Sequence, residues 1–413
     1  MRILSGAAAA ARVRKMASRG SRYTDVEPVV RRIIADVRKQ GDRALRKYAE
    51  QWDGLGAQES LQVSDAEIRS ACNAANPELK ASLRTAAANI RRFCESQKPV
   101  EWTRTRKGIT VGQIARPLDS VGCYIPGGRY PLVSTLLMTV IPAQVAGVKN
   151  IRVVSPQPRG EVLAAAGMLG LREIYRIGGA QAIAALAYGT KSIPNVDKIV
   201  GPGNVYVTAA KKLVSFDCAI DFLAGPTEVV IVSDVGTPEF IASDLVAQAE
   251  HDPEALAAFI TTHEDLARRV AAVVEKLSRR NAVARQSLRR NGVILVSTSR
   301  QQSLAWANEL AAEHLTVEAA DVALVRNAGS VFIGDYSPQA GGDYASGPNH
   351  VLPTGGAARF RGGLSVLDFV KLISVQRLSR SGLSGIAPVI ESLANAEGLR
   401  AHAESIRTRV GHA

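Results

Sequence analysis

Cysteine, histidine and aromatic residues are scarce in this sequence of 413 residues. It has four cysteines and six histidines, and Phe, Trp and Tyr together make up 5% of it. The cysteines, Cys72, Cys94, Cys123 and Cys218, stand far apart and form no C-x-x-C pair. This spacing argues against both a disulfide framework and a thiolate zinc site, and it favours a reducing, cytoplasmic location.

Long apolar runs are also missing. No segment approaches the roughly 18 uncharged apolar residues that a membrane-spanning helix needs, so no membrane association is expected. The first residues, MRILSGAAAAARVRKMASRG, are rich in arginine and precede the first acidic residue, Asp25. They resemble a transit peptide, whereas Arg12 and Arg14 follow the short alanine run too closely for a secretory signal. We favour a basic N-terminal arm, residues 1–24, of the mature protein.

Acidic residues are outnumbered by basic ones, which gives a formal net charge of +13. The densest basic segment is RRNAVARQSLRRN, residues 279–291. The basic residues lie on predicted helix faces without interleaved aromatics, and no nucleic-acid motif is present, so we expect solvated faces and no nucleic-acid partner. The excess charge would also attract polyanionic small molecules, including dinucleotides.

The apolar pattern predicts an α/β protein with more than one domain. Residues 26–97 carry apolar side chains at three- and four-residue spacing, which predicts helices. From about residue 110, short β-branched runs such as IRVVSP and TEVVIVSD alternate with helical segments, which indicates parallel βαβ units. The last fifty residues predict two short helices broken near Pro388 and Gly398. The fold class is therefore two Rossmann-like parallel-sheet domains with a helical N-terminal arm and a helical C-terminal tail.

Four loops rich in glycine and proline follow predicted strands. They are YIPGGRYP (124–131), GPGNVY (201–206), AGPTEV (224–229) and GGDYASGPNHVLPTGG (341–356). Open α/β sheets bind ligands where such loops gather, which favours a ligand cleft here. No G-x-G-x-x-G follows a strand, so the usual dinucleotide fingerprint is missing. Taken alone, Tyr124 reads as a core or stacking aromatic, and Gln181 as a polar residue at a helix start.

The stretch VAQAEHDPEA places a glutamine and a histidine on one predicted helix. Thr237 and Pro238 are suited to begin this helix, and Pro253 ends it. Gln248 and His251 are three residues apart, so both side chains emerge on the same face. Imidazole, carboxylate and amide oxygens elsewhere in the chain would complete a zinc site. From spacing alone, a zinc site and an ordinary polar surface remain alternatives.

Five ordered motifs resemble the histidinol dehydrogenase family. They are GPGNVYVTAAKKLV, AGPTEVVIVSD, DLVAQAEHD, AAEHLTV and GGDYASGPNHVLPT, and the likeness runs from about residue 25 to about residue 410. The resemblance implies NAD⁺-dependent, four-electron oxidation of L-histidinol through L-histidinal to L-histidine, the last steps of histidine biosynthesis. It also implies one Zn²⁺ per subunit, which orients the substrate, and a homodimer in which the tail helix completes the partner's active site.

Carried over residue by residue, the resemblance assigns specific roles. His314 would accept the alcohol proton, and Glu313 would activate the water that adds to the aldehyde. The implied zinc ligands are Gln248, His251, Asp343 and His402. These four residues and His314 would also contact histidinol, together with Thr227, His350, Glu397 and Ser134, although Ser134 reads equally well as a helix N-cap. The implied NAD contacts are Tyr124, Gln181 and Asn204.

The same resemblance suggests domain boundaries. Residues 25–123 plus 232–364 would form the first α/β domain with the N-terminal helices, and residues 124–231 the NAD-binding domain. Residues 365–413 would form a helical tail with dimer contacts.

Two positions depart from the family pattern, and two other functions compete. Thr227 stands where the family usually has serine, and Ala312 where it usually has proline. Cys123 raises a thioester mechanism as an alternative to an ordinary buried cysteine. A zinc- and NAD-dependent dehydrogenase of another polar alcohol is the nearest competitor, but His350 and Glu397 suit an imidazole-and-amine substrate. A non-enzymatic basic binding protein with a decayed site would not need the full ligand set.

Overall fold

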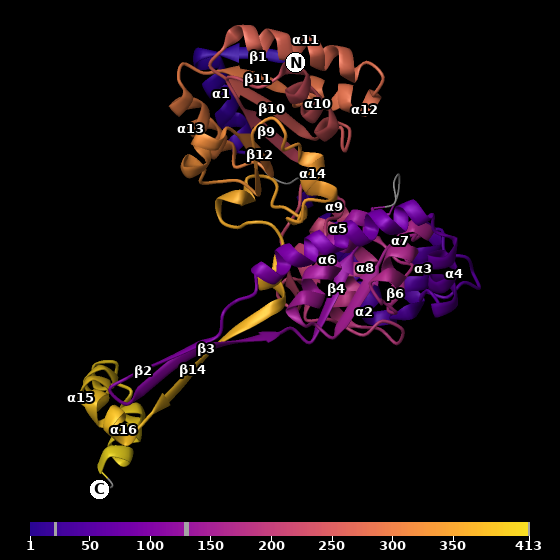
Figure 1. The fold of residues 1–413 in the computed structure, drawn as a ribbon. Helices are drawn as coiled ribbons and strands as arrows, with labels where there is room; N and C mark the ends of the chain where they lie inside the picture. The colour runs from indigo at the N-terminus through magenta and orange to yellow at the C-terminus, as the bar shows by residue number, and fades with distance from the viewer. Residues whose placement is uncertain (20–22, 128–131, 412–413) are drawn as a thin grey trace.

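Three sheets organise the chain in the computed structural model, which describes residues 1–19, 23–127 and 132–411 (Figure 1). Two of the sheets are parallel, and each forms the centre of a helix-covered lobe. The third is a long antiparallel ribbon that carries two helices away from both lobes. Within the described ranges, no helix is long and apolar enough to cross a membrane.

The first lobe contains a six-stranded parallel sheet in the order β1-β11-β10-β9-β12-β13. Its central strands are continuous apolar runs such as VVIV in β9 and LAAFIT in β10, as expected for strands that are covered on both faces. Helices α1 and α13 cover one face, and α10, α11 and α12 cover the other. The strands are β1 Arg2–Ser5, β9 Glu228–Val232, β10 Leu256–Thr261, β11 Val293–Val296, β12 His314–Val317 and β13 Ser330–Ile333. The helices are α1 Gly6–Ala17, α10 Pro238–Ala249, α11 Glu264–Ser278, α12 Ala282–Arg290 and α13 Arg300–Leu310.

The second lobe contains a five-stranded parallel sheet in the order β6-β5-β4-β7-β8. The chain builds β4, β5 and β6 in one direction and then returns to place β7 on the other side of β4, which creates a topological switch point between β4 and β7. The strands are β4 Ser120–Tyr124, β5 Asn150–Val154, β6 Ile174–Tyr175, β7 Lys198–Val200 and β8 Ala219–Ile220. The helices are α2 Glu27–Gln40, α3 Asp42–Trp52, α4 Asp65–Ala74, α5 Pro77–Ser96, α6 Val133–Ala146, α7 Gly160–Met168, α8 Gly179–Tyr188 and α9 Val205–Val214.

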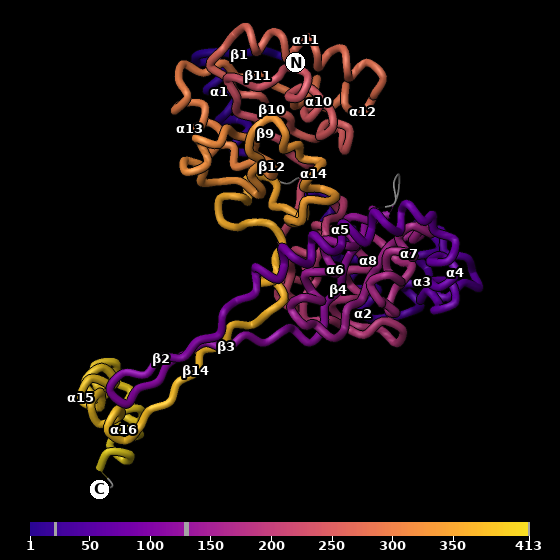
Figure 2. Tube along the Cα trace, in the orientation of Figure 1, coloured from indigo at the N-terminus to yellow at the C-terminus, as the bar shows by residue number. Residues whose placement is uncertain are grey.

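The ribbon joins segments that are far apart in the sequence. Strand β3 (Ile109–Pro117) lies between β2 (Trp102–Arg106) and β14 (Val370–Leu378), and α15 (Arg380–Ala396) and α16 (Arg400–Gly411) pack together at its end. Figure 2 shows the chain leaving the lobes along this ribbon. The shorter elements are η1 Tyr23–Val26, η2 Ala319–Leu324, α14 Gln339–Tyr344, η3 Ala357–Arg359 and η4 Val366–Phe369.

The C-terminal tail differs from its expected form in two respects. Its first part is strand β14, because residues 370–378 pair with β3 along their whole length. Helix α15 runs through Pro388, so the expected break is found only at Gly398, whose φ of 76° is readily adopted by glycine.

The sheets group the chain differently from the boundaries expected from the sequence. Residues 2–17 are built into the first lobe as β1 and α1 and are not a separate arm. The helices between residues 27 and 96 pack on the five-stranded sheet, as Val30 and Ile90 show, and not on the six-stranded sheet. Periodicity reveals which face of a helix is apolar, but it does not reveal which sheet that face covers.

Candidate active site

The amino ends of two neighbouring strands bring four polar residues together. β9 and β12 are parallel and adjacent, with Val229 opposite His314, so Thr227 and Glu228 lie beside Glu313 and His314. Glu228, Glu313 and His314 are all buried. The adjacent catalytic pair predicted from AAEHLTV thus lies on an inner strand of the six-stranded sheet, at the sheet edge where the strands begin.

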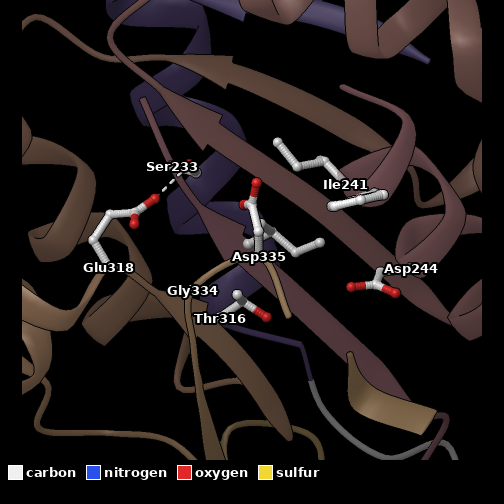
Figure 3. A pocket seen from close by; sticks show the side chains of 9 residues that line it. Ser233, Ile241, Asp244, Thr316, Glu318, Gly334 and Asp335 are labelled. Atoms are coloured by element: carbon white, nitrogen blue, oxygen red, sulfur yellow. Dashed lines mark hydrogen bonds between the residues drawn. The ribbon is translucent and has the colours of Figure 1, made fainter. Parts of the chain in front are cut away.

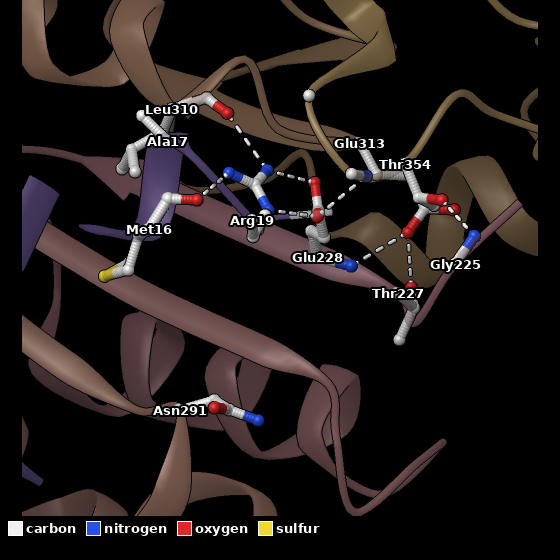
Figure 4. Close-up of polar contacts among 12 residues, drawn as sticks. Met16, Ala17, Arg19, Gly225, Thr227, Glu228, Asn291, Leu310, Glu313 and Thr354 are labelled. Carbon is white, nitrogen blue, oxygen red and sulfur yellow. Dashed lines mark hydrogen bonds and ion pairs between the residues drawn. The ribbon is translucent and has the colours of Figure 1, made fainter. Parts of the chain in front are cut away.

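Glu313 is held by two donors on one carboxylate oxygen. The Thr227 hydroxyl donates to Oε2 at 2.5 Å, and the backbone N–H of Glu228 donates to the same atom at 2.9 Å (Figure 4). Gln248 in turn donates its side-chain N–H to the Thr227 hydroxyl. Thr227 therefore connects the predicted water-activating carboxylate with a predicted zinc ligand.

His314 presents one ring nitrogen to the site and anchors the other. Nδ1 lies 3.1 Å from the backbone carbonyl oxygen of Glu228, to which it donates when protonated. Nε2 is buried without a hydrogen-bond partner among the described residues, and it lies 3.4 Å from Oδ1 of Asp343. Burial works against protonation of His314, but the carboxylates of Glu313 and Asp343 outweigh it and raise its pKa to about 10. Because the Glu228 carbonyl engages Nδ1, Nε2 is the ring nitrogen that faces Asp343.

Asp343 on α14 is surrounded by imidazoles. Burial opposes ionisation of Asp343, but the nearby imidazoles of His314, His350 and His251 lower its pKa overall. Its backbone carbonyl oxygen lies 2.7 Å from Nδ1 of His350. Nε2 of His350 lies 3.5 Å from the hydroxyl of Thr135 on α6, so this cluster also connects the two lobes. Burial lowers the pKa of His350 and favours its neutral form.

Gln248 and His251 lie at the end of α10, one turn apart. The helix begins after Thr237 as predicted, although the Thr237 hydroxyl donates to Asp335 and makes no capping bond. It ends at Ala249, two residues before His251, whose N–H donates to the Gln248 carbonyl at 3.4 Å. Because the side-chain amide nitrogen of Gln248 donates to Thr227, the side-chain oxygen of Gln248 remains available to a different binding partner.

His402 and Glu397 lie far from these residues within one chain. They belong to α16 and to the C-cap of α15, at the far end of the ribbon (Figure 1). The described residues contain no group of three or more His, Cys, Asp or Glu side chains that is arranged to hold a metal. The amide oxygen of Gln248, the imidazole of His251 and the carboxylate of Asp343 are chemically suited to zinc, but a single chain provides only three of the four expected ligands.

The residues predicted to contact NAD lie at the other sheet. Tyr124 ends β4, and its hydroxyl accepts a bond from the Gly179 N–H at 3.1 Å. Gln181 is 1% exposed and donates to Asp53 at 3.1 Å, while its Oε1 has no partner among the described residues. Asn204 caps α9 by accepting bonds from two backbone N–H groups. All three residues follow carboxyl ends of strands, and the loops after β4 and β7 flank the switch point.

Two backbone features shape this second edge. The segment 221–227 joins the end of β8 to the start of β9, and a chain of that length spans at most about 25 Å. Gly201 has a φ of 112°, and a side chain there would meet the Tyr124 carbonyl oxygen, so only glycine fits between β4 and β7. Residues 128–131 of the expected YIPGGRYP loop lie outside the described residues.

The positions of Ser134 and Cys123 decide two questions left open by the sequence, namely whether Ser134 caps a helix and whether Cys123 is a nucleophile. Ser134 lies in the first turn of α6, whose N-cap is Leu132, so Ser134 is not a helix cap. Cys123 is fully buried, and burial raises the pKa of its thiol to about 12. A thiol of this kind is not ionised at neutral pH and is a poor nucleophile, which argues against the thioester mechanism.

A small acidic cavity lies at the opposite edge of the six-stranded sheet. It occupies about 20 Å³ and is lined by residues that include Asp244, Glu318 and Asp335 (Figure 3). Burial raises the pKa of Asp244 to about 6. The cavity is too small for a dinucleotide, and its carboxylates would repel one.

Sequence reasoning missed several residues that support the site. Glu228 and Arg19 form an ion pair behind Glu313, and the Asp53 carboxylate accepts bonds from Gln181 and the Gly178 N–H. Glu228 carried a signal, since it is the one charged residue in the apolar strand EVVIV. Arg19 carried none, because it looked like any other basic residue of the expected arm.

Comparison with known proteins gives matches along most of the chain. The family model for histidinol dehydrogenase matches residues 16–410. The chain belongs to the histidinol dehydrogenase family. A histidinol dehydrogenase of Methanosarcina barkeri is 46% identical over 97% of this chain and 96% of its own length. One of Methanothermobacter thermautotrophicus is 48% identical over 94% of each.

A solved structure gives the same result for the fold. The crystal structure of histidinol dehydrogenase from Elizabethkingia anophelis matches with a TM-score of 0.95 and 36% identity, covering 100% of this chain and 98% of the other. Both the mixed α/β fold and an oxidoreductase activity of this family are therefore supported.

Proposed function

We propose that this protein is an NAD⁺-dependent enzyme that oxidises L-histidinol through L-histidinal to L-histidine. The observation that carries the proposal is the pairing of Glu313 and His314 beside Asp343, in a chain that belongs to the histidinol dehydrogenase family. Each turnover would transfer two hydrides to two NAD⁺ and consume one water. The two oxidations would need one group to accept the alcohol proton and one to activate the water.

His314 and Glu313 would carry out these two tasks. In the neutral form of the ring, Nε2 of His314 would accept the proton of the alcohol, because the Glu228 carbonyl engages the N–H at Nδ1 and leaves Nε2 facing the site. Glu313 would accept a proton from the water that adds to the aldehyde. Its Oε2 is fixed by Thr227 and Glu228, so the carboxylate does not have to be oriented during the reaction.

Zinc would be held by Gln248, His251 and Asp343 of one chain and by His402 of a second copy. When bound, the metal would supply a template that holds the imidazole and amine of the substrate. His350 would contact the substrate from the Asp343 side, together with Ser134 of α6. Glu397 would arrive with His402 from the second copy. Thr227 would contact the substrate beside Glu313.

A homodimer would explain why the tail projects from the lobes. The ribbon and α15 leave large apolar side chains exposed in one chain, among them Trp102, Leu372, Val389 and Leu393 at 44%, 49%, 60% and 61%. Exposed apolar surface of this extent favours burial against another protein. We propose that a second copy covers it, and that each tail thereby completes the other copy's active site.

NAD⁺ would bind at the carboxyl edge of the five-stranded sheet, between Tyr124, Gln181 and Asn204. The strand order supports this position, since the switch point between β4 and β7 is where open parallel sheets bind their ligands. We therefore propose that the second lobe binds the cofactor and the first lobe supplies the catalytic pair. Four unpaired cysteines fit the proposed cytoplasmic location.

The test is to incubate the purified protein with histidinol and NAD⁺ and to count the NADH formed per histidinol. We expect two NADH per substrate, loss of activity with a chelator and recovery with Zn²⁺. One NADH per substrate would contradict the four-electron reaction. A faster reaction with another polar alcohol would favour the related dehydrogenase instead.

A further inference from the structure

Arg19 reaches the back of the active site from the end of helix α1. Its Nε and Nη2 donate to the two carboxylate oxygens of Glu228 at 2.5 and 2.6 Å. Its Nη1 donates to the Met16 carbonyl at 2.7 Å, and Nη2 also donates to the Leu310 carbonyl at 2.9 Å (Figure 4). Two parallel bonds to one carboxylate fix both its position and its plane, which a lysine would not do.

Glu228 needs this partner because it is a buried charge. The residue is 3% exposed and lies next to a second carboxylate, Glu313. Burial raises the pKa of Glu228, Arg19 opposes that rise, and Glu313 adds to it. Without Arg19, Glu228 would have no ion-pair partner among the described residues to offset the neighbouring Glu313 carboxylate, and of these residues only the Gly355 N–H would still donate to the Glu228 carboxylate.

The backbone of Glu228 contacts both members of the catalytic pair. Its N–H donates to Oε2 of Glu313 at 2.9 Å, and its carbonyl oxygen lies 3.1 Å from Nδ1 of His314. Arg19 therefore anchors the side chain of Glu228, and the peptide groups of the same residue orient Glu313 and His314. Any shift of Glu228 would move both contacts together.

We propose that Arg19 is a positioning residue for the catalytic pair: by clamping Glu228, it holds the peptide groups that orient Glu313 and His314. The kinetic part of this inference rests on the proposed function. It also gives the N-terminal segment a role in catalysis, although Arg19 does not touch the reacting atoms.

The variant Arg19→Met tests the inference by steady-state kinetics. We expect kcat to fall about ten- to a hundredfold for histidinol and for supplied histidinal, because a small displacement of catalytic groups has effects of that order. Histidinol KM and zinc content should stay near wild-type values. In a Glu313→Gln background most of the Arg19→Met effect on the residual rate of histidinal oxidation should disappear, since residues that act through one another are not additive. An equal loss in both backgrounds would overturn the proposal.

Two further variants separate positioning from stability. Arg300→Met breaks a partly buried ion pair with Asp321 at the other edge of the same sheet, and it should lower the melting temperature while leaving kcat unchanged. An equal kcat loss there would overturn the proposal. If Arg19→Met does not fold, Arg19→Met combined with Glu228→Gln removes the uncompensated charge. We expect that protein to fold with a low kcat, whereas full kcat would show that the clamp is unnecessary.

A crystal structure of Arg19→Met decides the matter independently of turnover. The inference predicts that Glu313 leaves the Glu228 N–H, and an unchanged contact would refute it. If the wild-type protein failed to oxidise histidinol, the proposed function would fall, and this structural result would still decide the role of Arg19.

Discussion

Replacing Thr227 by valine removes one hydroxyl while keeping the size of the side chain, and it should affect two steps of the reaction. The hydroxyl donates to Glu313 at 2.5 Å and accepts the side-chain N–H of Gln248. A hydrogen bond to a charged group contributes about 1.5–3 kcal/mol. At about 1.4 kcal/mol per tenfold, its loss predicts a drop of roughly ten- to a hundredfold in the rate of aldehyde oxidation, in which Glu313 activates water.

The second effect should be on the metal. Without the Thr227 hydroxyl, the Gln248 amide is free to rotate, and loss of a group that orients a zinc ligand typically costs about ten- to a hundredfold in metal affinity. Histidinal oxidation and zinc affinity would be measured for Thr227→Val, with Thr227→Ser as the matched control. Serine keeps the hydroxyl and should retain both properties, with a modest change in histidinol KM. A valine variant that matches wild type in rate and zinc affinity would refute this reasoning.

Three other outcomes follow from the structure. Cys123→Ala should keep both oxidations, because the buried thiol is not ionised; selective loss of the aldehyde step in kinetic assays would contradict this. His402→Ala and Glu313→Gln chains should each have only residual activity alone. Co-expression of the two should restore about a quarter of wild-type activity, since half of randomly mixed dimers carry one intact shared site. No recovery would argue against a shared site. Burial raises the folded-state pKa of Asp244 to about 6, so the free energy of unfolding should fall as pH rises from about 4 to 6. Asp244→Asn should remove this pH dependence and add about 1–2 kcal/mol to the free energy of unfolding at pH 7, after allowance for solvent screening. Urea unfolding at several pH values would measure both effects.

Much of the fold was predictable because its elements are strongly patterned. The helices between residues 27 and 96 and the alternation of strands and helices are present as expected. β14 was missed, because its residues KLISVQR lie on an exposed ribbon and lack a buried face. Its pairing with β3 joins residues more than 250 positions apart, and no local pattern encodes such a contact.

The candidate site was predictable to a different degree for each residue. The spacing of Gln248 and His251 left a zinc site and a polar surface as alternatives, and the family resemblance selected them together with Glu313 and His314. The contacts among these residues depend on β9 and β12 being neighbours. Arg19 could not have been selected. Its role exists only because residues 2–17 join the six-stranded sheet and place the guanidinium against Glu228.

The sequence by itself therefore determined the secondary-structure types, the family and the chemical groups available for catalysis, since these depend on local periodicity and on motifs. Only the tertiary structure decided which of those groups meet. It placed His314 beside Asp343 and left His402 at the end of a projecting ribbon. The physical reason is that contacts between distant segments arise from the burial of apolar faces and the pairing of strands, and many arrangements of the same local elements satisfy the same sequence pattern.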